Sequence, residues 1–103
     1  GNYSGELRFP VNKTYSLDSE TPTDRTITRF YGIAATANAG GTAILAGSSG
    51  TIGQFSIVTG GAAAVLNAGG VGLSAGSTLE LTFQGITGFT ACSDFRFSIR
   101  YTQ

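Results

Sequence analysis

The 103-residue chain is long enough for one domain with a core of modest size, and its six basic and six acidic residues cancel. Balanced charge does not favour binding to nucleic acid or to an anionic membrane, and no apolar run reaches the roughly 20 residues that a membrane-spanning helix needs. Because histidine is absent and cysteine occurs once, Ser-His-Asp catalysis, Cys-His catalysis and a structural zinc site are excluded.

The N-terminal part of the chain predicts a loose arm, an edge strand and a polar loop. Residues 1–5 form the expected arm, which contains Tyr3. Apolar residues then alternate with polar ones on one face of a predicted strand, at Leu7, Phe9, Val11, Tyr15 and Leu17. Pro10 lacks the N–H group that a strand ladder needs, so this strand is expected at the edge of a sheet. Turn-forming and charged residues from 17 to 25 predict a loop.

Residues 26–37 are rich in β-branched and aromatic side chains and predict the next strand. Phe30 and Tyr31 are adjacent, so their side chains must point to opposite faces of this strand. This arrangement fits a strand that is covered on both sides, for example by a neighbouring subunit.

Shorter strands separated by glycine-rich turns are expected at 42–46, 51–59, 62–67 and 71–73. In the second of these, alternation places Phe55 and Ile57 on one face and Ile52 and Val58 on the other. Turns that recur every eight to twelve residues are typical of sandwiches and barrels.

The C-terminal residues predict a β-hairpin, because two alternating segments follow each other closely. Their apolar positions are Leu79, Leu81, Phe83, Phe95, Phe97, Ile99 and Tyr101. An antiparallel register that places Leu81 opposite Ile99 also places Glu80 opposite Arg100, so every opposed pair matches in chemistry.

These elements predict one all-β domain over residues 1–103, built as an antiparallel β-sandwich of about seven or eight strands. A jelly roll is one form of this arrangement.

The distribution of charge points to contacts with other proteins. No charged residue occurs from Phe30 to Leu79, whereas a free monomer usually keeps charges on its surface. We therefore expect other protein subunits as partners, with a homo-oligomer as the first expectation; a weakly charged monomer is the alternative. The aromatic residues that we single out as possible interface positions are Tyr3, Phe9, Tyr31 and Phe89.

Other chemistry receives little support, and we expect no catalytic residue, no cofactor and no metal. Asp18, Glu20 and Asp24 could supply oxygen ligands to calcium, but they lack the spacing of an EF-hand loop, and solvation is the better interpretation. Residues 70–75 match the dinucleotide pattern G-x-G-x-x-A without the strand and helix that it needs. We interpret Cys92 as a small side chain that fills space in the core.

The composition of the whole chain is similar to that of small β-sandwich decoration or cement proteins on tailed-phage capsids. The shared features are neutrality, abundant glycine, alanine, serine and threonine, and a lack of catalytic residues. This resemblance implies a non-enzymatic structural protein at a virion surface or another extracellular location. An extracellular filament or pilus subunit and a small carbohydrate-binding or adhesin module are the alternatives.

Overall fold

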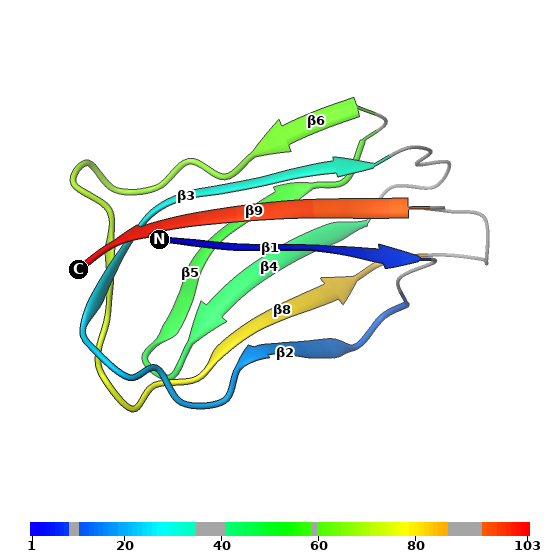
Figure 1. Cartoon of the computed structure of the whole chain (residues 1–103). Coiled ribbons are helices and arrows are strands. Elements are labelled where there is room, and N and C mark those ends of the chain that lie inside the picture. The colour runs from blue at the N-terminus through cyan, green and yellow to red at the C-terminus, as the bar shows by residue number, and fades with distance from the viewer. Residues whose placement is uncertain (9–10, 35–40, 59, 87–93) are drawn as a thin grey trace.

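The computed structural model describes residues 1–8, 11–34, 41–58, 60–86 and 94–103. Nine strands and no helix lie in these segments, and they form two antiparallel sheets packed face to face (Figure 1). Sheet A contains β1 (Asn2–Arg8), β3 (Arg25–Ala34), β6 (Gly60–Ala63), β7 (Val71–Leu73) and β9 (Asp94–Thr102). Sheet B contains β2 (Thr14–Asp18), β4 (Thr42–Gly47), β5 (Gly50–Ser56) and β8 (Leu79–Gln84). The predicted all-β sandwich is confirmed.

The strands pair in a nested order. β1 pairs with β9, β2 with β8, β3 with β6 and β7, and β4 with β5. The chain therefore resembles one long antiparallel ribbon, wrapped so that successive pairs fall alternately in the two sheets. The contacts β9–β3 and β8–β4 then complete the two sheets. This order is that of a jelly roll.

The predicted C-terminal hairpin is wrong, because β8 and β9 lie in different sheets. Leu81 is opposite Tyr15 and Leu45 in sheet B, and Arg100 is opposite Asn2 in sheet A. Glu80 and Arg100 are therefore not cross-strand partners. Alternation decides which face of a strand is apolar, but it does not decide which strand lies beside it.

The apolar faces of these two strands are nevertheless the ones that the alternation predicted. Side chains that are buried in the core are Leu79, Leu81, Phe83, Phe95, Phe97 and Ile99, and Tyr101 is half-buried. Phe83 and Phe95 meet across the core with their ring centroids 5.1 Å apart and their planes nearly perpendicular. The two strands therefore face each other between the sheets instead of pairing within one.

The predicted N-terminal arm is also wrong, because β1 begins at Asn2 and pairs with β9 along its whole length. Tyr3 and Leu7 point inward, but Gly5 interrupts the apolar alternation between them and concealed the strand. A side chain at Gly5 would approach the Phe97 ring to 2.9 Å, so the missing side chain makes room for the ring. The strand does lie at a sheet edge, as predicted, while Pro10 lies outside the described residues.

The number of strands exceeds the prediction because the segment containing Leu7 and Leu17 forms two strands. Leu7 lies on β1 in sheet A and Leu17 on β2 in sheet B, so they do not share one strand face. A short bend that contains Asn12 separates them. The Asn12 side chain fixes this bend, since it both donates to and accepts from the backbone of Ile86 at 2.8 Å.

Two bulges explain where alternation failed. In β5 we predicted Ile52 and Phe55 on opposite faces, but both are buried, because β5 carries an extra residue opposite β4. In β3 a similar bulge at Thr28 lets both Ile27 and Phe30 face the core. Tyr31 then points away from the core, as its position next to Phe30 predicted.

Candidate protein–protein interface

Charge is divided unequally between the two sides of the sandwich. All six basic and six acidic residues lie in the described segments, on β1, β2, β3, β8 and β9 or on the connections beside them. Strands β4 to β7 and the described residues that connect them carry none. The uncharged tract seen in the sequence is therefore one continuous part of the fold.

This uncharged part contains an exposed edge of each sheet. β5 is the last strand of sheet B and β6 the last strand of sheet A. The residues after β6 lie against β5, since a side chain at Gly53 would come within 2.5 Å of Leu66 and 3.0 Å of Ala64. We call β5, β6 and residues 58 and 64–70 the uncharged edge.

Two exposed valines stand on the uncharged edge. Inward positions alternate from β6 into the residues after it, since Ala62, Ala64 and Leu66 pack against the core. Between them Val65 points outward with 97% of its surface exposed, and Val58 is 51% exposed. Apolar residues on an uncharged strand edge are a template for association, because natural proteins usually place charges there to prevent it.

The opposite side of the sandwich is protected in this way. β1 is the outer strand of sheet A there, and two of its residues are ion-paired to β9, with Glu6 3.2 Å from Arg96 and Arg8 3.7 Å from Asp94. β2, the outer strand of sheet B, is directly preceded by the exposed residue Lys13. The two sides of one molecule thus differ in charge, which is the feature that natural proteins use to prevent association between strand edges.

Two of the residues singled out from the sequence as possible interface positions, Tyr3 and Tyr31, lie on strands next to the uncharged edge or away from it, and the Tyr31 ring lies beside Gly61 of β6. Tyr3 makes its contacts inside the chain, and Tyr31 lies on the outer face of sheet A, half-buried, with the Arg29 guanidinium 4.9 Å from its ring centroid. Phe9 and Phe89 lie outside the described residues. Val65 was missed because its only sequence signal is the absence of charge around it.

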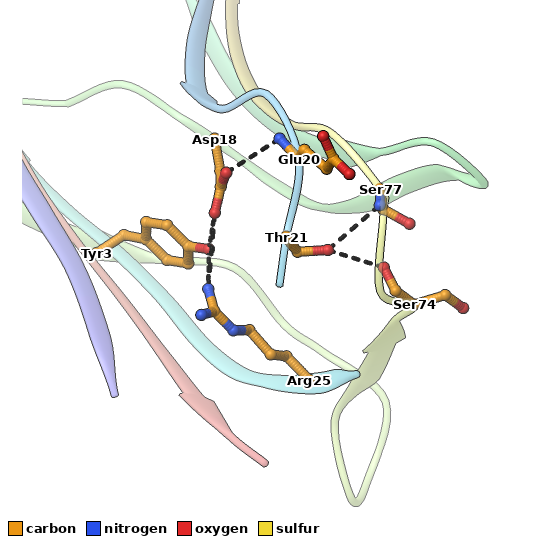
Figure 2. Close-up of polar contacts among 7 residues, drawn as sticks. All are labelled: Tyr3, Asp18, Glu20, Thr21, Arg25, Ser74 and Ser77. Carbon is orange, nitrogen blue, oxygen red and sulfur yellow. Dashed lines mark hydrogen bonds and ion pairs between the residues drawn. The ribbon is translucent and has the colours of Figure 1, made fainter. Parts of the chain in front are cut away.

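A polar cluster closes the end of the sandwich where β1, β2, β3 and β9 meet (Figure 2). The Tyr3 hydroxyl donates a hydrogen bond to Asp18 at 2.6 Å and accepts one from Arg25. The Arg25 side chain is only 9% exposed, and its guanidinium carbon lies 4.2 Å from the ring centroid of Tyr101. Because Asp18 belongs to sheet B and the others to sheet A, the cluster joins the two sheets.

This cluster makes stability depend on pH at both extremes. Burial, together with the hydrogen bond to Asp18, raises the pKa of Tyr3 from 10.0 to about 12. The hydrogen bond from Tyr3 holds the pKa of Asp18 below its ordinary value of 3.8. A group whose pKa is raised by folding stabilises the fold at pH values below its pKa in the unfolded chain, and a group whose pKa is lowered does so above its unfolded pKa. Tyr3 and Asp18 therefore both stabilise the fold in full between pH 3.8 and pH 10.0.

We expect the free energy of unfolding to fall as the pH rises from 10.0 toward about 12, where Tyr3 ionises in the folded protein. Tyr3→Phe should flatten this decline, whereas Tyr31→Phe should leave it unchanged. Unfolding in guanidinium chloride at a series of pH values measures both. If Tyr3→Phe showed the same alkaline decline as the parent protein, the assignment to Tyr3 would be wrong.

Hydrogen bonds hold the acidic loop, residues 19–24, against the connection between β7 and β8. Thr21 is buried, donates to the Ser74 carbonyl at 2.8 Å and accepts from the Ser77 N–H at 3.2 Å (Figure 2). Asp24 accepts a hydrogen bond from the Ala75 N–H at 2.8 Å. In the described parts of the chain no three acidic, histidine or cysteine side chains are grouped closely enough to hold a metal ion.

Among the residues that the structure describes there is no helix with the length and apolar character needed to cross a membrane. A comparison with protein-family models and with curated proteins finds no match for this chain.

Proposed function

We propose that this protein is a non-enzymatic structural subunit that acts through protein–protein contacts, most simply as a decoration or cement subunit on a viral capsid of the phage type. The observation that carries this proposal is the uncharged edge, where Val58 and Val65 are exposed just after β5 and β6, the last strands of the two sheets. In the assembled state this edge is covered by another copy or by a shell protein, and the molecule is located at a virion surface.

The uncharged edge supports this proposal more strongly than the jelly-roll fold does. Jelly rolls occur in viral capsid proteins and in lectins, and one fold serves many functions. An exposed valine gains about 1.5–3 kcal/mol when it is fully buried, and an unprotected strand edge adds backbone hydrogen bonds on association. Burial of Val65 and its neighbours therefore favours association, because a monomer does not gain this free energy.

An extracellular filament or pilus subunit is the second candidate, because the same unprotected edges could join copies in an open chain. Filaments arise when two unlike surfaces meet without closing a ring. The two sides of this sandwich are unlike, since only one carries charges. Electron microscopy of the native particle separates the candidates, since it shows the protein either on a shell or along a fibre.

We expect Val65→Lys to weaken association by about tenfold or more, because the lysine charge would be buried without a partner. Sedimentation analysis over a range of concentrations measures this change, and thermal melts verify that the variant folds. Val11→Lys is the matched control, since Val11 is 47% exposed but lies outside the uncharged edge. A parent protein that stays monomeric at high concentration, alone and with isolated shells or fibres, would overturn the proposed function.

A further inference from the structure

Two arginine side chains stand directly opposite each other on the outer face of sheet A. Arg29 of β3 and Arg100 of β9 are partners in the strand register, and both are exposed. Like charges in this position destabilise a sheet. Within the described segments, which contain every acidic residue, neither guanidinium forms an ion pair. The Arg29 guanidinium lies 4.9 Å from the Tyr31 ring centroid, and an anion from outside the chain would offset the remaining repulsion between the two arginines.

The bulge in β3 is what places these two side chains opposite each other. Ile27 pairs with Tyr101 and Arg29 with Arg100, so that Thr28 is the extra residue. Without the bulge, Thr28 would be the partner of Arg100. Bulges often redirect side chains next to functional sites. The same bulge that places Phe30 in the core therefore makes Arg29 and Arg100 cross-strand partners.

Polar groups without negative charge surround the two arginines. Asn2 of β1 is the partner of Arg100 on its other side, and two residues along the strands Ser98 is the partner of Tyr31. The Ser98 hydroxyl donates to the Asn2 side chain at 3.0 Å. We call this group the arginine patch; it consists of Asn2, Arg29, Tyr31, Ser98 and Arg100. Guanidinium groups bind carboxylates through two parallel hydrogen bonds, so the patch suits a carboxylate ligand.

The other charges of the chain indicate where the carboxylate comes from. Three ion pairs form between residues that the structure describes: Arg8–Asp94, Arg25–Asp18 and Arg96–Glu6. The charged residues outside these pairs are Lys13, Arg29, Arg100, Glu20, Asp24 and Glu80, three of each sign. Of these acids Glu20 and Asp24 are exposed and lie on the acidic loop, whereas Glu80 is half-buried.

We propose that the arginine patch binds the acidic loop of a second copy of this chain. The inference rests on the proposed assembly function and names one of its contacts. Charge complementarity supports it, since Glu20 and Asp24 match Arg29 and Arg100 in number and in exposure. The hydrogen bonds of Thr21 hold the loop in place, so little order has to be gained on binding.

Because the contact joins two different surfaces of the chain, it is compatible with a two-fold dimer in which it occurs twice, with a ring and with an open chain of copies. Exposed ion pairs contribute little to affinity, and their main effect is to select orientation and to raise the association rate. The uncharged edge would supply most of the binding energy, and the patch would set the register between neighbouring copies. High salt should therefore weaken association.

A charge-exchange experiment tests this contact. The patch variant carries Arg29→Glu and Arg100→Glu, and the loop variant carries Glu20→Arg and Asp24→Arg. Each alone should self-associate about tenfold more weakly than the parent, because like charges then meet in every contact. An equimolar mixture should regain affinity to within about threefold, since half of the possible contacts again join opposite charges.

Lys13→Glu is the matched control, because Lys13 is also outside the ion pairs and lies away from the patch on the connection before β2. Circular dichroism and thermal melts establish that each variant folds, and sedimentation gives the affinities. A parent that assembles together with a patch variant that assembles equally well overturns this contact and leaves the proposed function intact. A weakened patch variant that the loop variant does not restore overturns the acidic loop as the ligand. A parent that never assembles overturns both proposals.

Discussion

Phe95→Ala is expected to lower the free energy of unfolding by about 3–5 kcal/mol, as large-to-small substitutions in a core do. The Phe95 ring is completely buried in sheet A and contacts two rings of sheet B. Its centroid lies 5.1 Å from that of Phe83 and 6.0 Å from that of Phe55. The substitution therefore removes contacts that hold the two sheets together and leaves a cavity between them.

Chemical denaturation followed by circular dichroism measures this loss. A domain of this kind is stabilised by about 5–15 kcal/mol in total, so the substitution would remove a large share of the stability. Ser98→Ala is the control on the same strand, because Ser98 faces outward, and its substitution should cost less than about 1 kcal/mol. A Phe95→Ala protein as stable as the Ser98 control would contradict the packing of β9 against sheet B.

Arg25→Ala is expected to lower the free energy of unfolding by about 2–4 kcal/mol, since removing one partner of a buried ion pair leaves the other uncompensated. The Arg25 guanidinium is shared by the Tyr3 hydroxyl, the Asp18 carboxylate at 3.7 Å and the Tyr101 ring. The effect is smaller than for a fully buried pair, because Asp18 keeps its hydrogen bond from Tyr3 and is 21% exposed.

A double-mutant cycle with Asp18→Asn separates the ion pair from the packing of the arginine stem, because only the ion pair appears as a coupling between the two sites. Arg25→Lys keeps the charge but loses the planar group that lies over Tyr101, so its stability should fall between the parent and Arg25→Ala. Hydrogen exchange adds a local measurement, as β1 should lose protection first when its contact with β3 is removed. Unchanged exchange in β1 would show that the cluster does not anchor this strand.

The fold class followed from local patterns, whereas the pairing of strands did not. Leu81 and Ile99 were correctly placed on inward faces, because the alternation of a strand depends only on its own residues. Their partners were wrongly assigned, because matched chemistry between two neighbouring segments is equally compatible with one sheet or with two facing sheets. Nothing local to residues 79–102 distinguishes these arrangements.

The candidate interface was predictable only in part. The uncharged tract predicts that some surface meets other protein, but of the aromatic residues singled out only Tyr31 lies in that tract, and it belongs to β3, next to β6 of the uncharged edge. Val65 lies there because the nested pairing makes β5 and β6 the last strands of their sheets. The arginine patch was not predictable either. Arg29 and Arg100 are cross-strand partners because of the bulge at Thr28, and no residue near Thr28 indicates a bulge in the sequence.

The sequence by itself determined the β-sandwich class, the inward face of most strands and the segregation of charge along the chain, because alternation and composition are properties of neighbouring residues. Only the tertiary structure decided that β1 completes sheet A, that β8 and β9 face each other across the core, and that Val65 and Arg29 occupy exposed positions. These features depend on which distant segments exchange backbone hydrogen bonds. That choice is made by the packing of all nine strands together, since each apolar face must find a partner in the opposite sheet.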